Sequence, residues 1–133
     1  MRILKAVLAV AITMVALDLL FLGVLAKDFF DAQLGALRAS ETVWVAAALF
    51  YVHYVALIVG FAVLPARSVR VAALRGLGIG WVAYATFELT NWAVIAGWPA
   101  ALVPVDIAWG LCLTTAVAVM GRLAAGPPRV ATS

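Results

Sequence analysis

The sequence predicts an all-α integral membrane protein: a single domain folded as an antiparallel bundle of four transmembrane helices. Hydrophobic residues make up 68% of the 133 residues and charged residues only 11%, whereas soluble domains are about half apolar. Four apolar runs each have about the 20 residues that a helix needs to cross a bilayer. The runs are too long for the strands of a closed barrel, the other backbone that can span lipid.

The expected spans follow one another with short separators, and they cover residues 3–25, 43–64, 71–96 and 100–120. The polar stretch Lys27–Glu41, which includes KDFFDAQ, is predicted to be a solvated loop. Pro65 stops the second run, Gly97 ends the third, and Pro99 is expected in the first turn of the fourth, where proline is tolerated. Residues 126–133, GPPRVATS, are predicted to be a flexible cytoplasmic tail.

The basic residues predict an orientation. One side of the bundle is expected to hold most of them, Arg2, Lys5, Arg67, Arg70, Arg75, Arg122 and Arg129, and the other side only Lys27 and Arg38. The positive-inside rule therefore places both termini in the cytoplasm. The expected partner is the lipid bilayer, and the scattered arginines give no signal for nucleic-acid binding.

Each expected span carries one ionisable residue far from its ends: Asp18, His53, Glu88 and Asp106. Such residues cost at least a few kcal/mol in a membrane, so each is a candidate functional residue. At a rise of about 1.5 Å per residue, all four map to the middle or the outer half of the bilayer. We therefore expect one polar pocket that opens outward.

Helical periodicity adds neighbours to these four residues. In the third run, Trp81, Tyr84, Glu88 and Asn91 share a face, and in the fourth Asp106 and Trp109 do. In the second run, Phe50, His53, Leu57 and Gly60 share a face that is expected to point inward. The candidate ligand or proton pocket is thus Asp18, His53, Tyr84, Glu88, Asn91, Asp106 and Trp109. Because close carboxylates in a low dielectric cannot all ionise, we expect Asp18 and Glu88 to share protons.

Structural explanations exist for several of these residues. Asp106 is suitably placed to cap the fourth helix, His53 to bond the hydroxyl of Tyr84 or Thr86, and Asn91 to form an interhelical hydrogen bond. Three carboxylates and a histidine from four helices resemble a di-metal bundle, but the Glu-x-x-His pairs of such sites are missing. We therefore assign no metal site, and the cofactor stays unknown.

Four stretches carry a family resemblance: DLLFLG (18–23), LFYVHYVALIVGFAVLPA (49–66), YATFELTNWAVIAGWP (84–99) and VDIAWG (105–110). They resemble the domain-of-unknown-function family 2177 of small bacterial membrane proteins, over nearly the whole chain. The resemblance implies a four-span protein of the bacterial inner membrane and no particular activity. Its motif residues fall on Asp18, Tyr84, Glu88, Thr90, Asn91, Trp98, Asp106, Trp109 and Gly110, with Glu88 where the family has aspartate.

The sequence supports a site better than an activity. The leading hypothesis is a transport or channel component whose outward-facing acidic pocket binds or conducts a cation, proton or polar ligand, and which acts as a homo-oligomer. One alternative is a membrane-embedded lipid-modifying enzyme that uses Glu88 or Asp18 as general acid or base. Another is an accessory subunit of a larger membrane complex, in which the polar groups only join helices. Whether the protein is an enzyme is left open.

Overall fold

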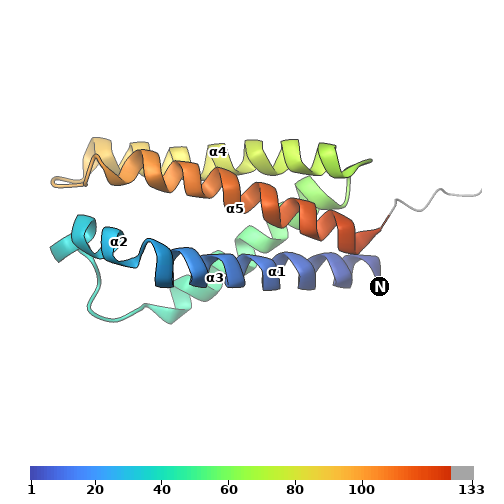
Figure 1. Ribbon diagram of the computed structural model, residues 1–133, viewed down its shortest axis with the longest axis horizontal. Helices are drawn as coiled ribbons and strands as arrows, with labels where there is room; N and C mark the ends of the chain where they lie inside the picture. The colour runs from blue at the N-terminus through green and yellow to red at the C-terminus, as the bar shows by residue number, and fades with distance from the viewer. Residues whose placement is uncertain (127–133) are drawn as a thin grey trace, which may run out of the picture.

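The computed structural model describes residues 1–126, which form an all-α bundle (Figure 1). The proposed tail lies outside the described residues, except for Gly126. Two of the long helices continue directly into π-helical segments, in which each N–H bonds the carbonyl five residues back. The elements are α1 (Arg2–Leu20), η1 (Phe21–Leu25), α2 (Lys27–Leu34), η2 (Gly35–Leu37), α3 (Trp44–Leu57), η3 (Ile58–Val63), α4 (Val69–Val94) and α5 (Leu102–Ala125).

Within residues 1–126, three segments are long and apolar enough to cross a membrane: Arg2–Leu25, Trp44–Val63 and Leu102–Ala125. Their starts agree with the expected spans to within two residues, and the last continues five residues further than expected. The third expected span corresponds to α4, which has 26 residues but carries more polar side chains. Pro99 lies in the turn before α5, where its carbonyl accepts a hydrogen bond from the N–H of Leu102 (3.0 Å), and not inside the helix.

Helices α4 and α5 run side by side from the turn that joins them and diverge toward the end of α5 (Figure 1). Glycines make this approach close. A Cβ added at Gly80 would lie 2.5 Å from the carbonyl oxygen of Gly110, and one at Gly76 would lie 2.7 Å from that of Thr114. Small residues of this kind are the usual basis of tight helix packing in membranes, because no hydrophobic force drives helices together there.

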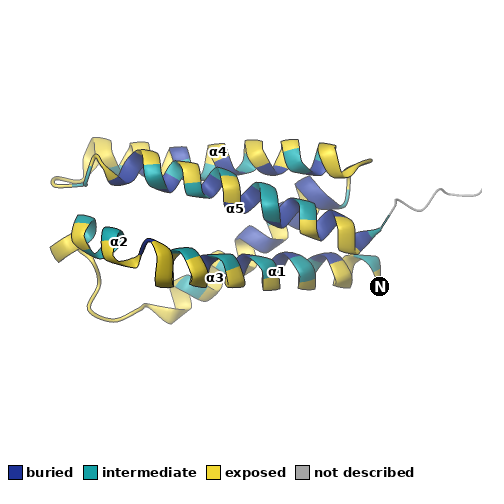
Figure 2. Ribbon diagram, viewed as in Figure 1, coloured by how far each residue is buried: buried dark blue, intermediate teal, exposed yellow. Residues whose placement is uncertain are grey.

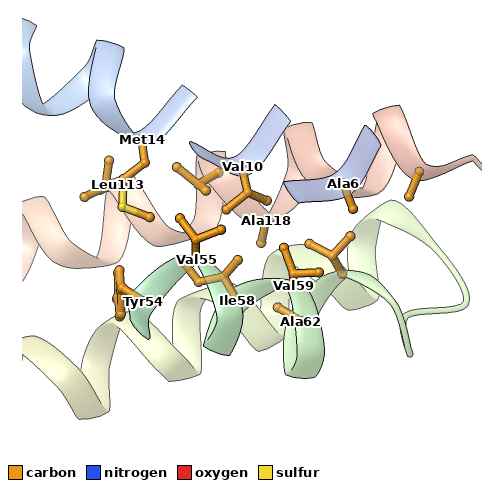
Figure 3. Close-up of a cluster of buried hydrophobic side chains, with 13 residues drawn as sticks. Ala6, Val10, Met14, Tyr54, Val55, Ile58, Val59, Ala62, Leu113 and Ala118 are labelled. Carbon is orange, nitrogen blue, oxygen red and sulfur yellow. The ribbon is translucent and has the colours of Figure 1, made fainter. Parts of the chain in front are cut away.

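The apolar core occupies the half of the bundle where α1 begins and α5 ends. It joins α1, η3 and α5 through fully buried side chains that include Val10, Met14, Ile58 and Val117 (Figure 3). Along α1 the buried positions recur every four residues, from Ala6 to Asp18. The interior of this half is therefore filled with apolar side chains, whereas the buried carboxyl groups lie toward the other end.

Arginines close the same end of the bundle, which we call the basic end. The buried Arg122 donates to the carbonyl oxygens of Ala66 (3.1 Å) and Arg67 (3.4 Å). Arg2 donates to the carbonyl of Leu64 and Arg75 to that of Phe61, both at 3.1 Å. Carbonyls at a helix C-terminus lack intrahelical partners and carry partial negative charge, so these guanidinium groups satisfy them and match their sign.

The opposite end, which we call the α2 end, differs from the sequence expectation. Residues 27–34 of the expected loop form the helix α2, whose half-buried Asp31 pairs with Lys27 (2.6 Å) and with Arg38. The hydrogen bond from Lys27 is the main reason that the pKa of Asp31 is lowered from its ordinary value. The i, i+4 spacing of Lys27 and Asp31 supports a helical turn, which the loop interpretation overlooked.

The second span is packed at one end and loose at the other. Its segment η3 contacts α1, α4 and α5, whereas α3 makes its main contacts with α1. The beginning of α3 is consequently exposed, with Trp44 at 77%, and Figure 2 shows this part of the ribbon mostly in the colours of exposed and half-buried residues.

The inward face expected for this span was wrong in part. Gly60 is exposed, and so is His53, while Tyr54, Val55 and Ile58 are buried. A uniformly apolar helix carries little signal for its phase, and its single polar residue is then a poor guide to the inward side. In α4, Trp81 is likewise 54% exposed, because the face of this helix that packs against α5 is the one with Gly76 and Gly80.

Candidate functional site

Asp18 is held by two hydrogen-bond donors from other helices. The Tyr51 hydroxyl of α3 donates to its Oδ2 atom (3.0 Å), and the Trp109 indole N–H of α5 donates to its Oδ1 atom (3.3 Å). The Trp109 ring stacks on Phe21 with 4.0 Å between ring centroids, which fixes the indole. Asp18 is 6% exposed. Asp18 thus accepts two hydrogen bonds and donates none, and this pattern suits an ionised carboxylate, which can only accept.

Glu88 and Asp106 form a second acidic group, at the contact between α4 and α5. Glu88 is 1% exposed, and the Trp98 indole N–H donates to its Oε2 atom (2.9 Å). The Asp106 carboxyl lies near Glu88, and both Glu88 and Asp18 are near enough to act on Asp106 electrostatically. Glu88 thus has Asp106 as its acidic neighbour across the α4–α5 contact, and the expected proton sharing between Asp18 and Glu88 stays a prediction.

The pairing follows from which helices are neighbours. Because α4 packs along α5, Glu88 meets Asp106, whereas α1 packs mainly on α5 and brings Asp18 to Trp109. The turn with Gly97, whose φ of +79° suits glycine, returns Trp98 over the end of α4. Asp106 is the fifth residue of α5, so it does not cap that helix.

A cavity of about 560 Å³ lies between α1, α3, α4 and α5 at this depth. Its polar lining comprises Asp18, Asp106, His53 and three tyrosines. Its aromatic lining is formed by Phe50, Tyr51, Tyr54, Tyr84 and Phe87. The Tyr54 hydroxyl bonds the Thr114 hydroxyl (2.7 Å), and the Tyr84 ring covers Gly110, where an added Cβ would lie 2.1 Å from the ring. The cavity thus combines carboxyl groups with aromatic faces.

The seven sequence candidates divide into three groups. Asp18, His53, Tyr84 and Asp106 line the cavity. Glu88 and Trp109 do not line it, but each contacts one of its carboxyl groups. Asn91 is half-buried on α4 and does not line the cavity.

Sequence reasoning left three contributors out of the pocket: Tyr51, Tyr54 and Trp98. The available signal was chemical. A hydroxyl or an indole N–H inside a long apolar run needs a hydrogen-bond partner, and the buried acids are the obvious acceptors. Trp98 entered the sequence analysis as a residue of the family motif and not as a member of the pocket.

A second hollow, which we call the α3–α4 groove, joins the cavity. It has a volume of about 900 Å³ and is lined by residues of α3, η3 and α4, among them Phe61, Arg75, Gly78 and Val82. His53, Leu57 and Ala83 line both hollows. His53 therefore lies at their junction and does not make the buried hydrogen bond that was considered for it.

The arrangement offers no preformed metal centre within residues 1–126. No group of three or more histidine, cysteine, aspartate or glutamate side chains in this part of the chain is placed to hold an ion. The chemistry that the described residues do offer is proton exchange on carboxyl groups and attraction of positive charge.

The long apolar helices and the acids buried among them define a multi-pass integral membrane protein. Residues 3–123 match the model of the family described as predicted membrane protein (DUF2177), and the chain belongs to that family. No curated protein and no solved structure matches the chain.

Proposed function

We propose that α4 is a fourth transmembrane helix and that both termini lie in the cytoplasm of a bacterial cell, with the bundle in the inner membrane. With 26 residues, α4 is about 39 Å long, more than the hydrocarbon core of about 30 Å. The start of α1 and the end of α5 lie at the same end of the bundle (Figure 1), as an even number of crossings requires. The basic residues at that end support the orientation.

A reporter fused to the C-terminus tests this topology. An alkaline phosphatase fusion is expected to be inactive and a green fluorescent protein fusion fluorescent, as for a cytoplasmic end. Phosphatase activity at the C-terminus would contradict the orientation.

For the site, we propose that the cavity binds a positively charged ligand and exchanges protons with it. The observation that carries this proposal is the meeting of Asp18 and Asp106 with five aromatic rings around one hollow. Aromatic faces attract cations, by about 2 kcal/mol where water is excluded. A carboxylate that accepts two hydrogen bonds supplies the fixed negative charge.

The Glu88–Asp106 pair supplies the exchangeable proton in this proposal. Asp106 lines the cavity, and Glu88 lies behind Asp106. When a cation enters the cavity, Asp106 can release a proton, and the two carboxyl groups together then hold one proton fewer. Trp98 holds Glu88 from the other side. This division of roles makes the pair sensitive to both the ligand and the pH.

The packed core favours a binding pocket over an open pore. Between the cavity and the basic end, α1, η3 and α5 are joined by side chains such as Met14, Ile58 and Val117, which are fully buried. A transport role therefore requires a second arrangement in which this half opens. Conduction through the arrangement described here is not part of the proposal.

Calorimetry of the protein in lipid nanodiscs, with tetramethylammonium as the probe, tests the site. Saturable binding is expected, and the heats in two buffers of different ionisation enthalpy should report proton release. Asp18→Asn is expected to weaken binding about tenfold, the effect of removing the fixed charge from an aromatic pocket. tert-Butanol, which has a similar size but no charge, serves as the control for tetramethylammonium.

The controls separate a lost site from a lost fold. Asp28→Asn, a change of the same kind at an exposed acid of α2, is expected to leave the affinity unchanged. If the wild-type protein shows no saturable heat, or if Asp18→Asn binds as tightly, the proposed site is wrong.

A second candidate function is acid–base chemistry on a membrane lipid. The specific observation in its favour is that the cavity is joined to the α3–α4 groove at His53 and Ala83. Comparison of membrane lipids between cells with the wild-type protein and cells with Glu88→Gln tests it. Accumulation of a precursor lipid in the variant supports an enzyme, and identical lipid profiles exclude one.

We also propose that the chain works as a homo-oligomer or as a subunit of a membrane complex. The support is the exposed apolar side of α3, where Val45, Leu49 and Val52 are each more than 60% exposed. Mass measurement of the protein extracted in native nanodiscs tests this, and a single copy in every particle would contradict it.

A further inference from the structure

We infer that the ligand of the cavity is an amphiphile with an ammonium head group and one alkyl chain, and that its chain lies in the α3–α4 groove. This inference rests on the proposed cation site and specifies its ligand. The head group would occupy the cavity beside Asp18 and Asp106. The ligand would then enter sideways from the bilayer, through the gap between α3 and α4.

Continuity of the two hollows is the first argument. His53, Leu57 and Ala83 line both, so the acidic cavity and the groove lie directly against each other, with only these three side chains at their junction. The loose packing of α3 provides the opening, since η3 contacts α4 closely and α3 does not. A molecule in the cavity can thus extend into the groove without displacing a helix.

Charge is the second argument, because it orients the occupant. The cavity carries two carboxyl groups, and the far end of the groove carries the guanidinium of Arg75, which donates to the Phe61 carbonyl. A positive head is attracted to the first end and repelled by the second. Between them the groove wall is apolar, with Leu57, Phe61, Ile79 and Val82.

Length is the third argument. From Ala83 to Arg75, α4 rises about 12 Å. One leaflet of a bilayer has a hydrocarbon depth of roughly 15 Å. The groove therefore covers most of the depth of one leaflet, and it descends from the cavity toward the basic end as the chain of an outer-leaflet amphiphile does.

Space is the fourth argument. Gly78 lines the groove, and a Cβ added there meets no atom within 4 Å. Gly76 and Gly80, on the same helix, are crowded against α5. Gly78 therefore keeps the groove open, although no close contact with another helix requires a glycine at this position.

Displacement of bound tetramethylammonium by decyltrimethylammonium, in nanodiscs, tests this inference. In Gly78→Leu, the added side chain fills the groove, and displacement by the decyl compound is expected to weaken by about fivefold or more. Binding of tetramethylammonium itself should not change. Gly60→Leu is the matched control, because Gly60 also has open space around it but does not line the groove.

Two further probes test the orientation and the charge. Decanoate has a similar chain with a negative head, and decanol has no charge; neither is expected to displace tetramethylammonium at the concentrations at which the decyl cation does. Val82→Trp, which narrows the groove from an exposed position, is expected to act as Gly78→Leu does.

The outcomes distinguish the two proposals. If tetramethylammonium binds normally and the decyl compound displaces it equally well in wild type, Gly78→Leu and Val82→Trp, the groove is not the chain site and the cation site stands. Equal displacement by decanoate or decanol also overturns the inference. If tetramethylammonium does not bind to the wild-type protein, the cation site itself is wrong.

Discussion

The two sides of α4 are built on opposite principles. Toward α5, Gly76 and Gly80 bring two backbones together so closely that a Cβ would overlap the partner helix. Toward α3, Gly78 faces a groove in which the same atom would contact nothing. The three glycines lie within five residues of each other.

This difference shows that a glycine in a membrane helix has no single meaning. On the closed side, the missing Cβ creates the contact, and on the open side it leaves a space that side chains from α3 do not fill. The closed side then brings Glu88 near Asp106, while the open side carries the groove that shares lining residues with the cavity.

The largest effect is expected for Gly80→Leu. The added side chain would overlap the backbone of Gly110, which has no freedom to yield, so the bundle should lose about 3 kcal/mol or more of stability. Gly78→Leu should change stability by less than about 0.5 kcal/mol. Thermal unfolding followed by circular dichroism measures both, and equal losses would remove the distinction between the two sides.

Arg122→Met is expected to rank second, at about 2 kcal/mol. It removes a buried guanidinium that bonds the carbonyls of Ala66 and Arg67, and these carbonyls then lack donors. The contact between η3 and α5 should loosen, so the open side would extend toward the basic end. Hydrogen exchange of residues 58–67 should rise, and unchanged protection there would count against this role of Arg122.

Tyr54→Phe is expected to lower the free energy of unfolding by about 1 kcal/mol, because it deletes the hydrogen bond to Thr114 that joins α3 to α5. Thr114→Val should have a similar effect, and the double variant should cost little more than either single change. Fully additive losses in thermal unfolding would show that the two hydroxyls do not act together.

The smallest effect is expected at the exposed α2 end. The Lys27 hydrogen bond lowers the pKa of Asp31 in the folded chain, so the stabilisation is present above the unfolded value of about 3.8 and disappears as the pH falls below it. Hydrogen exchange in α2 should therefore rise below about pH 3.8, and much less of this rise should remain in Asp31→Asn. An equal rise in both proteins would assign it to other groups.

Much of the fold could be predicted from the sequence. The lengths of the apolar runs located the long helices to within a few residues, because crossing hydrocarbon demands about 20 residues with all backbone groups satisfied. Helix α2 was missed, since a polar segment of that length carries no comparable demand. The π-helical segments η1 and η3 were also missed, because apolar composition does not distinguish i–4 from i–5 bonding.

For the site, the sequence identified the acids but not their partners. Asp18, Glu88 and Asp106 were recognised because a carboxyl in an apolar span is costly wherever it lies. The donors Tyr51 and Trp98 were missed, and His53 was expected to be more buried than it is. Those errors concern which way a helix faces, for which a nearly uniform apolar run gives weak evidence.

The sequence by itself thus determined a family of membrane proteins, the positions of the long helices and the positions of the acids along them, because composition, length and motif residues suffice for these. Only the tertiary structure decided that Glu88 meets Asp106, that Asp18 is held by Tyr51 and Trp109, and that α4 has one closed and one open side. The physical reason is that helical periodicity states which residues share a face. Which helix that face meets depends on the packing of small and large side chains from distant parts of the chain.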